Sequence, residues 1–157
     1  MPDEAATLQF AAALAGAMRA KLNIYLHGDL GAGKTTLVRG LLHALGHVGK
    51  VKSPTYSLME AYEVNANNHF KFNLYHFDLY RFNDDEEWES AGFRDYFNAE
   101  NVCVIEWPEK AQNLLPRPDL DITFDIKMLG GSLGRRITVT AHTILGKQCL
   151  QAISIEK

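Results

Sequence analysis

The stretch "HGDLGAGKTTL", residues 27–37, decides the fold class of this 157-residue chain. Gly28, Gly33, Lys34 and Thr35 have the spacing of a phosphate-binding loop. Glycines let backbone N–H groups turn toward phosphates, the lysine charge faces the outer phosphates, and the threonine hydroxyl is a ligand for Mg²⁺. The stretch therefore predicts a nucleotide site at the start of a helix, where the positive end of the helix faces the anion.

Apolar residues on both sides place this loop between a strand and a helix. The run "LNIYLHG" (22–28) is typical of a buried strand, and "KTTLVRGLLHALG" (34–46) has apolar residues along one helical side and a glycine at its end. Residues 2–20 also have helical spacing. This strand–loop–helix order is the context in which the loop pattern indicates nucleotide binding.

The rest of the chain alternates between predicted strands and helices. Strands are expected over 54–64, 70–80 and 101–107, helices over 84–97 (interrupted near Gly92), 108–115 and 144–154, and an antiparallel hairpin over 120–128 and 135–143 around the glycine-rich 129–134. We therefore expect one phosphate-loop ATPase domain over residues 1–157. Its α/β fold would be a three-layer sandwich with a mixed, mostly parallel sheet and a C-terminal antiparallel hairpin.

Two acids that follow apolar runs are candidates for the metal and the chemistry. In phosphoryl-transfer sites a second strand ends in an acid that faces the phosphate loop, and Glu106 ends the run "VCVIE". Asp78, in "HFDLYR" (76–81), lies between the loop and Glu106 in chain order and is expected near Mg²⁺ or the attacking water. Trp107 follows Glu106 directly; packing beside the nucleotide is one interpretation, and burial in the core is the default expectation.

The segment "KSPTYSL" (52–58) has the features of a nucleotide-dependent switch. Pro54 stiffens it, and the hydroxyl of Thr55 is suited to sense the terminal phosphate. A simple proline turn before a strand explains the same residues equally well.

Composition limits the partners and the compartment. The net charge is −3, whereas a protein that grips nucleic acid through its phosphates is usually basic, so any RNA is expected to be held mainly by a partner. The two cysteines, Cys103 and Cys149, form no CxxC pair, which suits free thiols in a reducing cytoplasm. No apolar run approaches the ~20 residues of a membrane span, so a cytoplasmic protein without a membrane partner is expected.

The nucleotide is expected to be an adenine nucleotide. A GTPase normally has an N-K-x-D element that recognises guanine, and this sequence contains none.

The motifs together resemble one family. "GDLGAGKTTLVRG", "VKSPTYSL", "YHFDLYR", "GFRDYF" and "VIEWPEK" are similar, in this order, to the bacterial tRNA threonylcarbamoyladenosine biosynthesis ATPases of the TsaE family. The resemblance covers nearly the whole chain, from Pro2 into the last hairpin. It implies an ATPase that is slow alone, is stimulated by the partner proteins TsaB and TsaD, and supports their turnover, with tRNA contacted only through that complex.

The resemblance also implies roles for individual residues. Lys34, Asp78 and Glu106 would be catalytic, and Thr35 and Glu106 would hold Mg²⁺. ATP or ADP would be bound by Asp3, Glu4, Gly31, Ala32, Gly33, Lys34, Thr35, Thr36 and Arg135. The loop "KMLGGSLGRR" (127–136) is longer than usual for the family, which leaves Arg136 as the alternative to Arg135.

Two other functions remain open from the sequence. A small phosphate-loop kinase would need an acceptor site for a metabolite and an arginine-bearing lid. A nucleotide-gated binding module would bind its partner in one nucleotide state without significant hydrolysis.

Overall fold

The computed structural model describes residues 4–18, 21–29, 31–51, 54, 57–66, 70–97 and 101–155. Its strands are β1 (Leu22–His27), β2 (Met59–Ala66), β3 (Phe70–Asp78), β4 (Asn101–Glu106), β5 (Leu120–Leu129) and β6 (Ser132–Ala141). Its helices are α1 (Glu4–Ala17), α2 (Lys34–Ala44), α3 (Asp85–Ala91) and α4 (Ile144–Ile155), with 3₁₀ turns at Phe93–Tyr96 and Pro108–Ala111.

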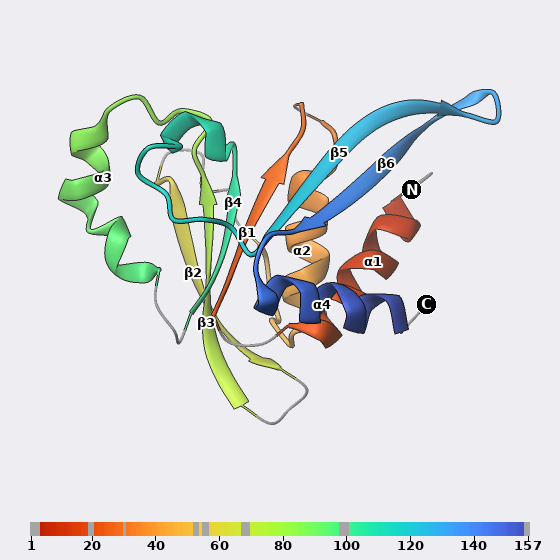
Figure 1. The fold of residues 1–157 in the computed structure, drawn as a ribbon, viewed down its shortest axis with the longest axis horizontal. Coiled ribbons are helices and arrows are strands. Elements are labelled where there is room, and N and C mark those ends of the chain that lie inside the picture. The colour runs from red at the N-terminus through yellow and green to blue at the C-terminus, as the bar shows by residue number, and fades with distance from the viewer. Residues whose placement is uncertain are drawn as a thin grey trace.

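The strands form one mixed sheet. Its order is β2-β3-β4-β1-β5-β6 (Figure 1). Strands β3, β4, β1 and β5 are parallel to one another, while β2 and β6 pair antiparallel at the two edges. This arrangement confirms the predicted α/β fold with a mixed, mostly parallel sheet and a C-terminal hairpin.

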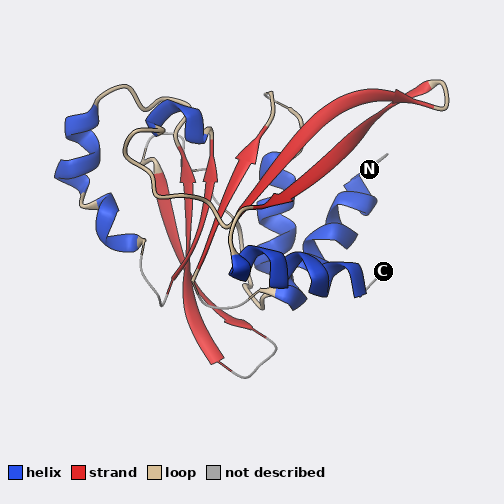
Figure 2. Ribbon diagram, in the orientation of Figure 1, coloured by secondary structure: helices blue, strands red, loops and turns tan. Residues whose placement is uncertain are grey.

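Helices cover both faces of the sheet, which gives three layers (Figure 2). On one face α1, α2 and α4 pack over a core that includes Leu14, Ile24 and Leu41. On the other face α3 and the 3₁₀ turns enclose a second core that includes Phe77 and Trp88. Strand β4 is buried at every position, as expected for a strand covered on both faces.

The parallel strands bring their carboxyl ends to the same edge of the sheet. Glu106 at the end of β4 is in register with Leu26 of β1 and with Asp78 of β3. The loop between β1 and α2, which the sequence predicts to bind phosphate, begins at this edge. In open α/β sheets ligands bind outside the carboxyl ends of the strands, so this edge is where a ligand site is expected.

Strand β2 begins later than the sequence predicted. The expected strand over 54–64 starts only at Met59, because a turn precedes it. The N–H of Leu58 donates to the carbonyl of Pro54 at 2.8 Å, and Leu58 has a φ of 68°. A positive φ at a bulky residue is incompatible with an extended strand.

The C-terminal hairpin is longer, and its turn tighter, than predicted. Leu129 still belongs to β5 and Ser132 already belongs to β6, so only two residues connect the strands instead of 129–134. Gly130 and Gly131 both have positive φ angles, of 59° and 90°. Two consecutive residues with positive φ form the tight turn that matches the twist of a hairpin.

The expected interruption of the helix over 84–97 is confirmed. Gly92 has a φ of 69° and ends α3 at Ala91, after which the chain continues as a 3₁₀ turn. The predicted helix over 108–115 is shorter, since its helical part is the 3₁₀ turn Pro108–Ala111. Within the described ranges, no helix combines the length and the apolar character that a membrane crossing requires.

Candidate functional site

The loop between β1 and α2 has a backbone conformation that requires glycine. Gly28, Gly31 and Gly33 have φ angles of 151°, 80° and 109°. A Cβ atom at Gly28 would lie 2.9 Å from the carbonyl oxygen of Phe124, and one at Gly33 would lie 3.3 Å from the Arg135 side chain. The loop therefore passes close to the hairpin and leads into the first turn of α2, where helix N–H groups attract anions.

A cavity of about 410 Å³ opens beside this loop, a volume typical of small-molecule sites. The predicted site residues that line it are Gly31, Gly33, Lys34, Thr35, Thr36, Asp78, Glu106 and Arg135. Tyr80, Arg81 and Trp107 line it as well, and Ala32 is buried within the loop. The fold thus brings together residues that are far apart in the sequence.

Lys34 lies at the base of this cavity. Its side chain is 4% exposed, and its ammonium donates a hydrogen bond to the carbonyl of Gly28 at 2.5 Å. Burial lowers the pKa of the Lys34 ammonium, while the carboxylates of Glu106 and Glu109 oppose this shift. A phosphate beside Lys34 would compensate the buried charge, which is the chemistry expected of this lysine.

Thr35 and Glu106 meet next to Lys34. The Thr35 hydroxyl donates to Glu106 Oε1 at 3.3 Å, with Oε2 at 3.4 Å. A hydroxyl and a carboxylate are the hard oxygen donors that Mg²⁺ prefers. In the described part of the chain, no three His, Cys, Asp or Glu side chains are grouped to hold a metal. A cation between Thr35 and Glu106 would therefore share its coordination with phosphate oxygens and water, as Mg²⁺ usually does at nucleotides.

Asp78 is partly buried at the end of β3. Its Oδ1 accepts a hydrogen bond from the N–H of Tyr80 at 3.1 Å. Burial raises the pKa of the Asp78 carboxyl, and the neighbouring Glu106 raises it further, while the Tyr80 hydrogen bond acts in the opposite direction. Backbone bonds hold this strand end in place, because the Asp78 N–H donates to Leu58 and the Leu79 N–H to Glu106.

His76 is a site residue that sequence reasoning did not select. Its Nε2 lies 2.6 Å from Glu106 Oε2, and the two side chains are 0% and 3% exposed. The available signal was its spacing, since residues two apart in a strand share a face and His76 precedes Asp78 by two. Nothing in the sequence alone, however, fixed the register between β3 and β4 that brings His76 to Glu106.

Trp107 is not fully buried, contrary to the expectation. It has a φ of 59° directly after β4, and its ring stands over Lys34 in the cavity wall. Its ring centroid lies 5.0 Å from that of Tyr80. The left-handed backbone turns this side chain out of the strand and toward the loop, which a buried strand pattern does not indicate.

The structure places Arg135, and not Arg136, beside the phosphate loop. The guanidinium of Arg135 donates to the carbonyl of Gly31 at 3.4 Å. Arg136 is exposed and pairs in register with Asp125. Because neighbouring residues of a strand point to opposite faces, only one of the two arginines can reach the loop.

Three predicted site residues are not located by their side chains. Asp3 and Thr55 lie outside the described residues, and Glu4 is described only as the first residue of α1. Their assigned roles stay predictions.

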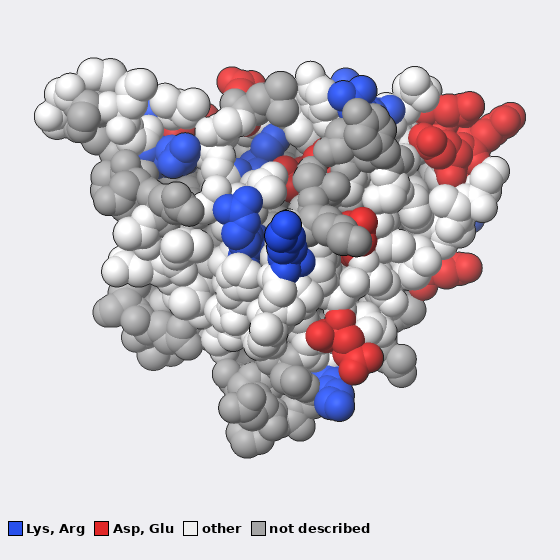
Figure 3. All heavy atoms as spheres, turned by 180° about the vertical axis from the view of Figure 1, so that it is seen from behind, with Lys and Arg blue, Asp and Glu red and all other residues white. Residues whose placement is uncertain are grey.

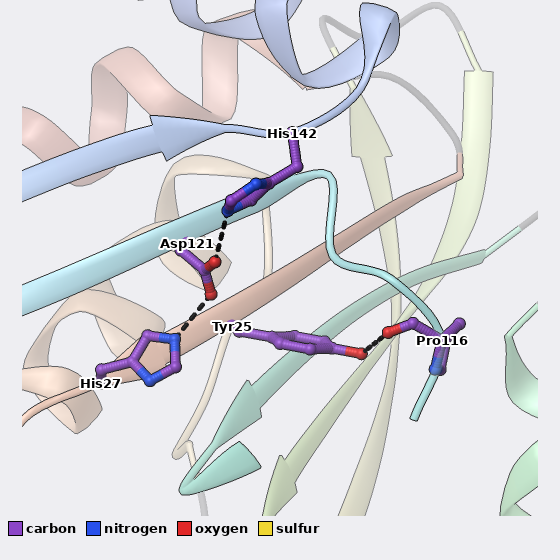
Figure 4. A network of polar contacts seen from close by, with 5 residues as sticks. All are labelled: Tyr25, His27, Pro116, Asp121 and His142. Carbon is purple, nitrogen blue, oxygen red and sulfur yellow. Dashed lines mark hydrogen bonds and ion pairs between the residues drawn. The ribbon is translucent and has the colours of Figure 1, made fainter. Parts of the chain in front are cut away.

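A second polar network lies away from the cavity (Figure 4). The two carboxylate oxygens of Asp121 are each 2.6 Å from an imidazole Nε2, one of His27 and one of His142. Beside it the Tyr25 hydroxyl donates to the carbonyl of Pro116. The network joins β1, β5 and the residue after β6 on the sheet face opposite α1 and α2. Sequence reasoning did not predict it, because it depends on the β1–β5 pairing.

The charged side chains are unevenly distributed over the surface (Figure 3). Acidic side chains gather over α3, where Asp84, Asp85, Glu86, Glu87 and Glu89 are all exposed. On the face shown, the Lys and Arg side chains of the described residues lie in separate small groups. On the face shown, the described residues therefore form no continuous basic surface of the kind on which nucleic-acid binding usually depends.

The chain is similar to proteins of known pathway. The sequence model of the family named "Threonylcarbamoyl adenosine biosynthesis protein TsaE" matches residues 1–137. The tRNA threonylcarbamoyladenosine biosynthesis protein TsaE of Haemophilus influenzae is 44% identical, over 98% of this chain and 95% of that protein. The protein of the same name from Bacillus subtilis is 40% identical, over 74% of this chain and 67% of that protein.

The fold is similar to a solved structure. The crystal structure of YdiB from Bacillus subtilis superposes with a TM-score of 0.76 and 27% sequence identity, covering 99% of this chain and 92% of the other.

Proposed function

This chain belongs to the TsaE family of tRNA threonylcarbamoyladenosine biosynthesis proteins, and from that premise we propose that it is a Mg²⁺-dependent ATPase of this pathway. Hydrolysis supports the turnover of the partner proteins TsaB and TsaD, and tRNA is contacted only through their complex. One observation carries the proposal. The Thr35 hydroxyl lies 3.3 Å from Glu106 Oε1, and both residues line the same cavity as Lys34.

ATP binding rests on the loop and on the two cations beside it. The backbone of residues 28–33 and the start of α2 receive the phosphates, and Lys34 places its ammonium against the outer ones. The Arg135 side chain reaches the loop from β6 and adds a second positive charge. Asp3, Glu4 and Thr36 are further nucleotide contacts in this proposal, and adenine is the base.

Thr35 and Glu106 are the residues that would hold Mg²⁺. When bound, the ion neutralises phosphate charge and assists departure of the leaving group. Glu106 is suited to this role because it is buried, already faces Thr35, and lies at a strand end that two neighbouring strands fix.

Asp78 orients the attacking water in the proposed reaction. It lines the same cavity as Lys34, and its raised pKa makes it a better proton acceptor than an exposed aspartate. Thr55 is the proposed sensor of the terminal phosphate, in the segment that leads into Leu58. The backbone bond from Asp78 to Leu58 would connect that segment to the site.

The partners follow from the family and agree with the charge of the chain. A net charge of −3 and dispersed basic groups favour contact with proteins over direct contact with tRNA. Two free, buried cysteines agree with action in the reducing cytoplasm.

The test is ATP hydrolysis with Mg²⁺ by the purified chain, alone and with purified TsaB and TsaD. We expect a slow rate alone and a clear increase with both partners. The Glu106→Ala variant should impair hydrolysis more than it impairs ATP binding. Arg135→Ala should weaken nucleotide binding, with Arg136→Ala as the matched control on the opposite face of the same strand.

Three results would contradict the proposal. A rate that the partners do not change would point to a kinase, which then has to transfer phosphate to a small hydroxyl compound. Nucleotide-dependent partner binding without any turnover would point to a gated binding module. Equal hydrolysis by wild type and Glu106→Ala would remove Glu106 from the mechanism.

A further inference from the structure

The imidazole of His76 makes a short contact with the carboxylate of Glu106. The two side chains come from neighbouring parallel strands, and Nε2 and Oε2 are 2.6 Å apart. His76 is fully buried and Glu106 nearly so. This is a charge-assisted hydrogen bond between two buried side chains, and such bonds are stronger there than at the surface.

His76 is an unfavourable choice if its only role is packing. On the same face of the sheet its neighbours Leu74 and Val104 are apolar and buried. Its cross-strand partner Glu60 on β2, and Asp78 two residues further along β3, are partly exposed acids. Among the described residues, His76 Nδ1 has no hydrogen-bond partner. An apolar side chain of similar size would bury no polar atom at this position. The benefit of His76 therefore has to come from its contact with Glu106.

The contact has a direction. An ionised carboxylate only accepts hydrogen bonds, so His76 donates from Nε2 when it contacts Glu106 in that form. His76 thus acts as a donor to Oε2.

We infer that His76 is a positioning residue for the proposed Mg²⁺ site. By holding Oε2 it fixes the plane of the Glu106 carboxylate before nucleotide arrives, so that the group is already oriented toward Thr35. This inference rests on the proposed function, because it assigns the purpose of the contact to Mg²⁺. Loss of a residue that hydrogen-bonds to a metal ligand typically lowers metal affinity by roughly 10- to 100-fold.

The test compares three substitutions of His76 in the full chain. Gln places an N–H donor where Nε2 stands, Asn places one where Nδ1 stands, and Leu provides none. For each variant the affinity for a fluorescent ADP is measured at saturating Mg²⁺ and in excess EDTA. The ratio of the two affinities reports the metal contribution separately from the phosphate loop and separately from catalysis.

We expect His76→Gln to keep most of the wild-type Mg²⁺ enhancement. His76→Asn and His76→Leu should lose it by roughly tenfold or more, with little change in the affinity measured in EDTA. A His76→Leu protein whose Mg²⁺ enhancement equals that of wild type overturns the inference and leaves the proposed function intact. A wild type whose affinity does not respond to Mg²⁺ overturns the proposed metal site itself.

A second measurement does not depend on any substitution. ¹⁵N NMR of histidine-labelled wild-type protein, without nucleotide, should show a proton on Nε2 of His76. An imidazole with no proton on Nε2 would mean that His76 does not donate to Glu106 and would also overturn the inference.

Discussion

The ammonium of Lys34 lies 3.5 Å from the centroid of the Trp107 ring, within cation–π distance. An aromatic ring thus covers the lysine that we propose to bind phosphate. In the proposed function a phosphate that reaches Lys34 would have to share the ammonium with this ring or displace it, which would couple nucleotide binding to the position of Trp107.

Tryptophan fluorescence should therefore report nucleotide binding. The chain has two tryptophans, and Trp88 is in the core with 1% exposure. In a Trp88→Phe variant we expect ADP to change the emission of Trp107 in a saturable manner, because its cationic neighbour changes partner. A Trp107→Phe variant, which retains Trp88, is the control and should show no such change. If saturating ADP does not change the fluorescence emission of Trp107, the nucleotide does not bind beside this residue.

Replacement of Lys34 by alanine should remove most of the affinity for nucleotide. Hydrogen bonds to charged groups contribute ~1.5–3 kcal/mol, which corresponds to a loss of roughly 10- to 100-fold. Calorimetric titration of wild type and Lys34→Ala with ADP measures this loss of affinity. Arg39→Ala is the matched control, since Arg39 is an exposed cation on the same helix. If Lys34→Ala binds ADP as tightly as wild type does, the loop between β1 and α2 is not the phosphate site.

Replacement of Asp78 by asparagine should stabilise the protein while it impairs hydrolysis. Because the pKa of Asp78 is raised in the folded state, its carboxylate form destabilises the fold. The penalty begins as the pH rises through the unfolded value of about 4 and is complete above the folded value. Asn keeps the acceptor for the Tyr80 N–H without the charge.

Thermal unfolding without nucleotide checks this expectation for Asp78. The Tm of Asp78→Asn should exceed that of wild type at pH 7, and the difference should shrink as the pH is lowered toward 4. A lower Tm at pH 7, or a difference that grows with acidity, would contradict the sign of the shift.

Asp119 should contribute to stability although it is remote from the cavity. Its Oδ2 accepts the Asn23 N–H and its Oδ1 accepts the Thr143 hydroxyl, both at 2.7 Å. Asp119→Ala should cost about 1–3 kcal/mol, because it leaves a donor of β1 without a partner. Denaturant unfolding measures the loss, with Asp125→Ala, an exposed position of β5, as the control. Equal stability of the two variants would show that the contacts of Asp119 contribute nothing.

The two cysteines should be unreactive in the folded protein. Cys103 and Cys149 are free and buried, and burial raises the pKa of the Cys103 thiol, which suppresses the thiolate that reacts. Ellman's reagent should therefore react with neither cysteine in the native state and with both after denaturation. Fast reaction of the native protein would show that one of them is accessible.

The loop between β1 and α2, and these two elements themselves, were predictable because their signals are local. The spacing of Gly28, Gly33, Lys34 and Thr35 depends on neighbouring residues only, and the ends of β1 and α2 lie within two residues of the predicted ends. The meeting of Thr35 with Glu106 was also predictable, since carboxyl ends of parallel strands share one edge.

The remaining features depend on pairing between distant segments. His76 reaches Glu106 only through the β3–β4 register, and the Asp121 network only through the β1–β5 register. A strand pattern shows which residues share a face but not which residue of another strand lies opposite. Trp107 was misjudged for a different reason, because its positive φ interrupts the alternation that a strand pattern assumes.

The central place of β1 in the sheet has a consequence for synthesis. Its two neighbours are β4 and β5, which follow it only in the second half of the chain. When β1 and the phosphate loop leave the ribosome, the strands that will hold them, and the hairpin that carries Arg135, have not been translated. A nascent chain therefore has the complete loop motif before it has the cavity beside the loop. If ATP binds there as proposed, it would stabilise only molecules whose translation has passed the final hairpin.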